Sequence, residues 1–109
     1  MIWIIFLALG AKAEVLSGPV LDDLNAYQPV RMCYNNLIRR HPKSTEGKVT
    51  MSMRLGKTGE VVAARPIPEQ TTYQDKKFLS CLSDALQILR FSKMANADQK
   101  TLEASLYFP

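Results

Sequence analysis

The chain has 109 residues, of which 47% are hydrophobic and 22% charged, and its formal net charge is +4. This length suits one domain with one core, and the composition excludes a disordered chain or a coiled coil. The charge is only mildly basic and no basic stripe is interleaved with aromatic residues, so we expect no nucleic-acid binding.

The stretch MIWIIFLALGAKA, residues 1–13, predicts a cleaved signal peptide. An apolar run from Met1 to Ala11 precedes an Ala-x-Ala site, which places the cut before Glu14. The run is shorter than the roughly 20 residues that span a bilayer, so we expect no membrane span in the mature chain. Cleavage removes Lys12 and lowers the net charge by one. The alternative interpretation is a buried N-terminal strand.

Residues 14–27 show no sustained hydrophobic period, so we expect a tether there. A helix is predicted to begin at Gln28, because Pro29 suits the first helical position. It ends at His41, because Pro42 disfavours helical geometry in the residue before it. Apolar residues recur along it at helical spacing: Val30, Cys33, Tyr34, Leu37 and Ile38.

A β-hairpin is predicted next. From Gly47 onward, apolar residues alternate with polar ones, as in a strand with one buried face; they are Val49, Met51, Met53 and Leu55. The stretch GKTG, residues 56–59, predicts a turn. Residues 61–64 form the returning strand, which Pro66 ends.

A second helix and a third strand complete the predicted order helix, strand, strand, helix, strand. Thr71 and Gln74 match a capping box at the start of this helix. Its apolar face comprises Phe78, Cys81, Leu82, Ala85, Leu86 and Leu89. After a polar stretch over residues 96–100, the last strand alternates between two sets: Leu102, Ala104, Leu106 and Phe108 against Thr101, Glu103, Ser105 and Tyr107.

The two cysteines, Cys33 and Cys81, lie on the apolar sides of the two predicted helices. Both helices must cover the same face of a small sheet to bury these sides, so the sulfur atoms can meet. An oxidising compartment makes such a bond durable, and a loop of this length would stabilise the fold by about 4 kcal/mol. We predict a structural disulfide; the alternative is two unlinked small hydrophobic residues in the core.

Residues suited to catalysis or metal binding are few, so we expect no enzyme, no cofactor and no metal. The single histidine, His41, lies at a helix end without a matching nucleophile. Asp22 and Asp23 are adjacent and project in different directions, which makes them poor metal partners. Met51 and Met53 place two thioethers on one strand face, which suits Cu(I), but a buried strand needs the same spacing. We therefore predict core packing for both.

One local basic cluster offers an alternative function. It consists of Arg39, Arg40, Lys43 and Lys48. Such clusters are usually solvated surfaces, but this one would suit an anionic envelope glycan or lipid head group. A complex of this kind weakens steeply with salt.

Four stretches, taken in their order and spacing, resemble the C-terminal domain of the AgmX/PglI gliding-motility proteins, itself similar to the C-terminal domain of TonB. They are CYNNLIRRHP, GKVTMSMRLGKTGEVV, FLSCL and LEASLYFP. The resemblance covers residues 28–109. It implies a small α+β domain in which two helices pack on one face of a three-stranded antiparallel sheet.

TonB-like domains can accept an extended peptide along an open edge of the final strand, which by position is residues 101–108 here. The resemblance therefore implies an edge strand with four partner-facing residues: Thr101, Glu103, Ser105 and Tyr107. The expected partner is an envelope protein or peptide, or a second copy paired edge to edge. Together with the signal peptide, this predicts a periplasmic, non-enzymatic interaction domain of a Gram-negative envelope, linked to gliding motility or envelope transport.

Overall fold

The computed structural model describes residues 14–43, 46–91 and 100–108. The predicted signal peptide, residues 1–13, and residues 96–99 of the polar stretch lie outside the described residues. Within the described ranges, no helix combines the length and hydropathy needed to cross a membrane. The elements in chain order are β1 (Glu14–Val15), α2 (Gly18–Asn25), α3 (Gln28–Arg40), β2 (Gly47–Leu55), β3 (Val61–Pro66), η1 (Pro68–Gln70), α4 (Lys76–Gln87) and β4 (Thr101–Phe108).

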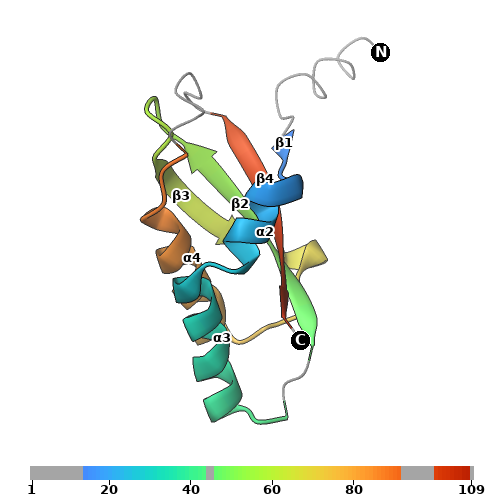
Figure 1. Cartoon of the computed structure of the whole chain (residues 1–109). Coiled ribbons are helices and arrows are strands. Elements are labelled where there is room, and N and C mark those ends of the chain that lie inside the picture. The colour runs from blue at the N-terminus through green and yellow to red at the C-terminus, as the bar shows by residue number, and fades with distance from the viewer. Residues whose placement is uncertain (1–13, 44–45, 92–99, 109) are drawn as a thin grey trace, which may run out of the picture.

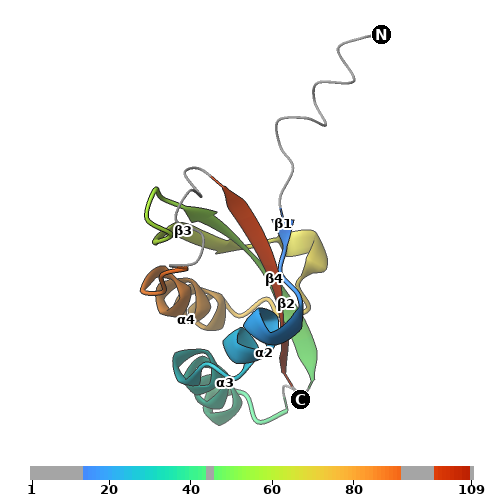
Figure 2. The same ribbon diagram turned by 45° about the horizontal axis from the view of Figure 1, so that its top comes forward.

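The strands form one mixed sheet in the order β1-β4-β2-β3 (Figure 1). Strand β2 is antiparallel to both β3 and β4, whereas β1 is parallel to β4. Helices α2, α3 and α4 lie on the same side of this sheet (Figures 1 and 2). The α+β class is confirmed. The expected three-stranded antiparallel sheet is corrected, because β1 adds a fourth strand with parallel pairing.

Residues 14–27 form β1 and α2, so the prediction of a tether there is wrong. Pro19 lies in the first turn of α2, where its missing N–H is not needed. Gly18, with φ of 70°, turns the chain into the helix. Leu16 and Leu24 are buried in the core, and this burial holds the segment against the rest of the domain.

Helix α3 and the hairpin match the predictions from hydrophobic spacing. α3 ends at Arg40, with His41 as its C-terminal cap residue. The β2–β3 hairpin contains a bulge, because Leu55 pairs with Val61 whereas Arg54 pairs with Ala63. Gly59 in the turn has φ of 85° and passes so close to the Phe91 carbonyl that a Cβ atom would collide with it.

The second long helix, α4, begins later than the capping box predicts. Its N-cap residue is Asp75, whose carboxylate accepts a hydrogen bond from the Phe78 N–H at 2.9 Å. Thr71 instead donates its hydroxyl hydrogen to the Ile67 carbonyl oxygen at 2.8 Å. Thr71 and Asp75 both have side chains that can cap a helix, but the chain at position 71 is not yet helical, so only Asp75 caps α4.

The core lies between the helices and the sheet. Met51 and Met53 are fully buried in it, as the packing interpretation predicts. At one end, four rings lie edge to face, tilted or stacked, with centroids 5.0 to 6.4 Å apart. They belong to Tyr34, Tyr73, Phe78 and Phe108. Burial first, and then Tyr34 and Glu46, raise the pKa of Tyr73 to about 12.

The predicted disulfide between Cys33 and Cys81 is present and joins α3 to α4. The two Cα atoms are 5.7 Å apart. Cys33 is buried, whereas Cys81 is partly exposed. The bond closes a loop across 48 positions and fixes the two long helices side by side.

Candidate functional site

The outer side of β4 was the predicted peptide-binding edge, and the structure shows that it is covered. Strand β1 pairs alongside the first half of β4, with Glu14 opposite Leu102 and Val15 opposite Glu103. Beyond β1, the Leu16 N–H donates to the Glu103 carbonyl oxygen at 2.8 Å.

Two side chains cover the second half of β4. The Asn25 side chain behaves like a strand residue: its Nδ2 donates to the Ser105 carbonyl at 3.2 Å, and its Oδ1 accepts from the Tyr107 N–H at 2.8 Å. Arg31 donates from Nη2 to the Tyr107 carbonyl at 2.8 Å and from Nε to the Asn25 carbonyl at 2.6 Å. Its guanidinium also lies 4.9 Å from the centre of the Phe108 ring.

The prediction that residues 101–108 form a free edge is therefore wrong, because β4 lies between β1 and β2. The alternation predicted for this strand does hold, with Leu102, Leu106 and Phe108 buried. The opposite face of the strand carries Thr101, Glu103, Ser105 and Tyr107. Asn25 and Arg31, which close the edge, have no local sequence pattern that identifies this role.

The sheet ends on its other side at β3. The start of this strand is also covered, because the Val61 N–H donates to the Leu89 carbonyl at 3.3 Å and the Phe91 N–H donates to the Gly59 carbonyl at 2.7 Å. Residues 89–91 therefore run beside the beginning of β3 but do not cover residues 62–66 of this strand.

Residues 62–66 present main-chain groups to the outside. The Ile67 N–H donates to the Thr50 carbonyl at 2.8 Å, and hydrogen-bonded pairs alternate along an antiparallel ladder, so the main-chain groups of Ala63 and Arg65 face β2. The N–H and carbonyl of Ala64 therefore point away from the sheet, as does the carbonyl of Pro66, which has no N–H. In the described part of the chain, no main-chain hydrogen bond reaches these outward groups.

The predicted basic cluster is divided by the structure. Arg39 and Arg40 lie at the end of α3, and Lys43 is exposed just beyond it. Lys48 lies in β2 on the face opposite the helices, since its neighbour Val49 is buried toward them. Lys48 therefore belongs to a different surface from the arginines.

A hollow of about 390 Å³ opens over the disulfide, where α3 ends and α4 begins. Its lining comprises Cys33, Asn36, Arg39, Arg40, Lys77 and Cys81. Lys77 and Asn36 were not part of the predicted cluster. Lys77 is distant from the arginines in the sequence, and only the packing of α3 against α4 brings it to the same hollow.

Asp75 joins the two helices beside this hollow. Its carboxylate is 3.2 Å from Arg40 Nη1 and 3.0 Å from His41 Nε2. The Phe78 N–H, followed by Arg40 and His41, lowers the pKa of Asp75 below its ordinary value of 3.8 and outweighs the opposing effect of burial. His41 is thus placed as a partner of a helix-capping carboxylate.

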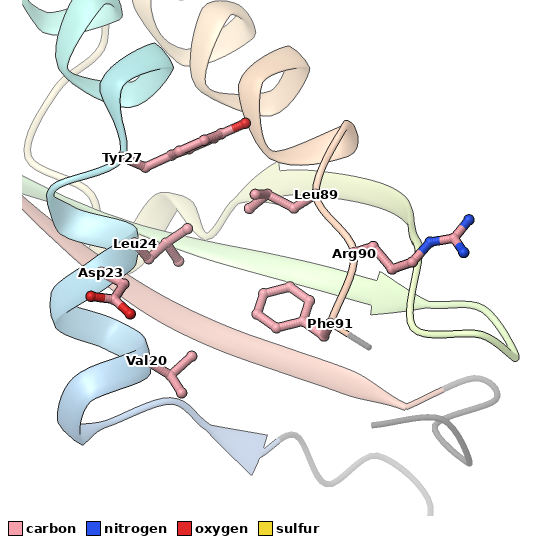
Figure 3. A pocket seen from close by; sticks show the side chains of 7 residues that line it. All are labelled: Val20, Asp23, Leu24, Tyr27, Leu89, Arg90 and Phe91. Carbon is pink, nitrogen blue, oxygen red and sulfur yellow. The ribbon is translucent and has the colours of Figure 1, made fainter. Parts of the chain in front are cut away.

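A second hollow, of about 210 Å³, lies between α2 and residues 89–91 (Figure 3). Its lining is mainly apolar and comprises Val20, Asp23, Leu24, Tyr27, Leu89, Arg90 and Phe91. In Figure 3, Arg90 points away from α2, while Leu89 and Phe91 face it. The hollow has space for a small apolar group, and its lining includes no serine, cysteine or histidine that could act as a nucleophile or base.

Among the residues that the structure describes, no group of three or more histidine, cysteine, aspartate or glutamate side chains could hold a metal ion. Comparison with known protein families, with curated proteins and with solved structures found no match to this chain. The resemblance to the AgmX/PglI and TonB domains therefore stays a prediction from the quoted motifs.

Proposed function

We propose that this chain is a non-enzymatic protein-interaction domain outside the cytoplasm, which binds an extended peptide of a partner protein along the outer side of β3. The observation that carries the proposal is the outward N–H and carbonyl of Ala64, next to the outward carbonyl of Pro66. Strand addition draws its affinity from such main-chain groups.

The covalent structure supports the proposed location. A disulfide between Cys33 and Cys81 persists in oxidising compartments and is rare in the cytosol. The signal peptide predicted for residues 1–13 agrees with export to the periplasm. A role in envelope transport or gliding motility rests on the family resemblance alone.

The shape of β3 favours a short peptide over a second copy of the domain. Its bulge near Val62 and its terminal Pro66 are features that discourage pairing of long edges. Val62 and Arg65 expose their side chains beside the outward groups, so they would contact alternate residues of the peptide. The cation of Arg65 favours an acidic residue in the peptide.

A photoreactive residue at Val62, compared with one at Asn36 on α3, tests this proposal in living cells. Both positions are exposed, and only Val62 lies at the proposed edge. We expect a partner peptide to be captured from Val62 and not from Asn36, and identified by mass spectrometry.

The variant Ala64→Pro provides the matched control, because it removes the outward N–H and leaves the pairing with β2 in place. Capture from Val62 must disappear in this variant if the peptide adds as a strand. Unchanged capture in Ala64→Pro, or equal capture of the same peptide from Asn36, would contradict strand addition at β3.

A further inference from the structure

The positive charge of this protein is concentrated where α3 ends and α4 begins. Five basic side chains and one acid belong to this end: Arg39, Arg40, Lys43, Lys76, Lys77 and Asp75. With five positive charges and one negative, this set has a net charge of +4, against +3 for the chain without residues 1–13. This end of the protein therefore attracts anions.

The hollow over the disulfide lies within this basic end and is open to the surface. Its volume of about 390 Å³ exceeds that of a bare inorganic anion and leaves space for an attached organic group. Cys33 and Cys81 supply an apolar part of the lining, while Asn36 adds an amide.

Two cations that line the hollow lack an acidic partner. Arg40 is paired with Asp75 at 3.2 Å, so its charge is compensated. In the described ranges, by contrast, no carboxylate lies within ion-pair distance of Arg39 or Lys77. Arg39 donates a long hydrogen bond from Nη1 to the Asn36 Oδ1 at 3.5 Å.

We propose that this hollow is a binding site for a phosphate monoester group, carried either by a soluble small molecule or by a lipid head group. Such a group carries a charge of about −1.5 to −2 at neutral pH, which matches the two uncompensated charges of Arg39 and Lys77. A single carboxylate would leave one of them unpaired. The planar fork of arginine and the point charge of lysine both suit phosphate oxygens. This site is independent of strand addition at β3.

The test compares the native protein with the double variant Arg39→Gln/Lys77→Gln. The control is Arg54→Gln/Lys57→Gln, which removes the same two charges from exposed positions in β2 and the hairpin turn. Soluble ligands are inorganic phosphate and phenyl phosphate, followed by amide chemical shifts. Lipid binding is measured by cosedimentation with phosphatidylcholine vesicles that contain phosphatidic acid, against vesicles of phosphatidylcholine alone.

We expect the site variant to lose at least about tenfold in affinity, and the control to stay within about twofold, because only the former loses charged hydrogen bonds. The largest shifts should occur at Asn36 and Lys77. Binding of phenyl phosphate assigns a soluble source, and binding of phosphatidic acid vesicles alone assigns a lipid source. The site is refuted if both variants weaken equally, or if the native protein binds none of these phosphates.

Discussion

The two sides of the sheet differ in how their main-chain groups are satisfied. On the outer side of β4, the backbone of Leu16 and the side chains of Asn25 and Arg31 bond to the strand. On the outer side of β3, a backbone segment covers only the beginning of the strand, and the groups of Ala64 point outward. Although β4 is the last strand in the sequence, it is not at the edge of the sheet, because β1 pairs beside it.

The closed side also shows that a side chain can replace a strand. The amide of Asn25 offers one donor and one acceptor, the same pair that a main-chain residue offers to its neighbour. Proteins cover strand edges in this way to prevent unwanted pairing. On the open side of β3, a bulge and Pro66 discourage unwanted pairing instead.

The disulfide supports both sides of the sheet, so its removal should have the largest effect. α3 stacks Tyr34 on Phe108 of β4, whereas α4 packs against β3. The double variant Cys33→Ala/Cys81→Ala should lower the free energy of unfolding by about 4 kcal/mol, measured in urea. A loss below about 1 kcal/mol would show that the cross-link adds little to packing.

Proline at adjacent positions of β3 should separate inward from outward main-chain groups. Arg65→Pro removes an N–H that faces β2 and leaves a carbonyl of β2 without its donor, so it should destabilise the fold by about 1–3 kcal/mol. Ala64→Pro removes an outward N–H, and should lower the free energy of unfolding by less than about 1 kcal/mol. Equal effects of the two variants would mean that the register of β3 is wrong.

Removal of the Asn25 amide should open the closed side. Asn25→Ala loses two hydrogen bonds to β4, a change of about 1–2 kcal/mol in the free energy of unfolding. The Tyr107 amide should then exchange faster with deuterium, and sedimentation should show self-association at high concentration. Asn25→Asp keeps the acceptor, so the Tyr107 amide should remain protected in that control.

Asp75 caps α4 and pairs with the end of α3, and its replacement should have the smallest effect. Asp75→Ala should lower the free energy of unfolding by about 1 kcal/mol at neutral pH, whereas Asp75→Asn keeps a helix cap and should lose less. Because folding lowers the pKa of Asp75, its stabilising contribution is complete above 3.8 and is lost as the pH falls through the lowered value.

Thermal unfolding as a function of pH should therefore show native protein and Asp75→Ala converging in acid. Deuterium exchange at Ala64 and Tyr107 should keep its native pattern in this variant. A difference that persists at the lowest pH would assign the effect of Asp75 to packing and not to its charge.

Elements with strong local periodicity were predictable from the sequence. Helix α3 follows from its apolar spacing and the prolines at each end, and β2 follows from alternation. The start of α4 was not predictable, because Thr71 and Asp75 are both helix-capping residue types and only the fold decides between them. In α2, Pro19 is a helix-entry signal that the adjoining Gly18 obscures.

The candidate sites depend on contacts between distant parts of the chain, and these were less predictable. The disulfide could be inferred, because both cysteines lie on apolar helix faces. The parallel pairing of β1 with β4 joins opposite ends of the chain and has no local pattern. Lys77 joins Arg39 only because α4 packs antiparallel to α3 at that end, which hydrophobic spacing alone does not specify.

Residue-resolved deuterium exchange of the native protein tests the contrast between the two sides most directly. The Tyr107 amide, which donates to Asn25, should exchange slowly, while the outward Ala64 amide should exchange much faster than the Ala63 and Arg65 amides that face β2. Protection of Ala64 equal to that of Arg65, together with fast exchange at Tyr107, would contradict the assignment of β3 as the open side.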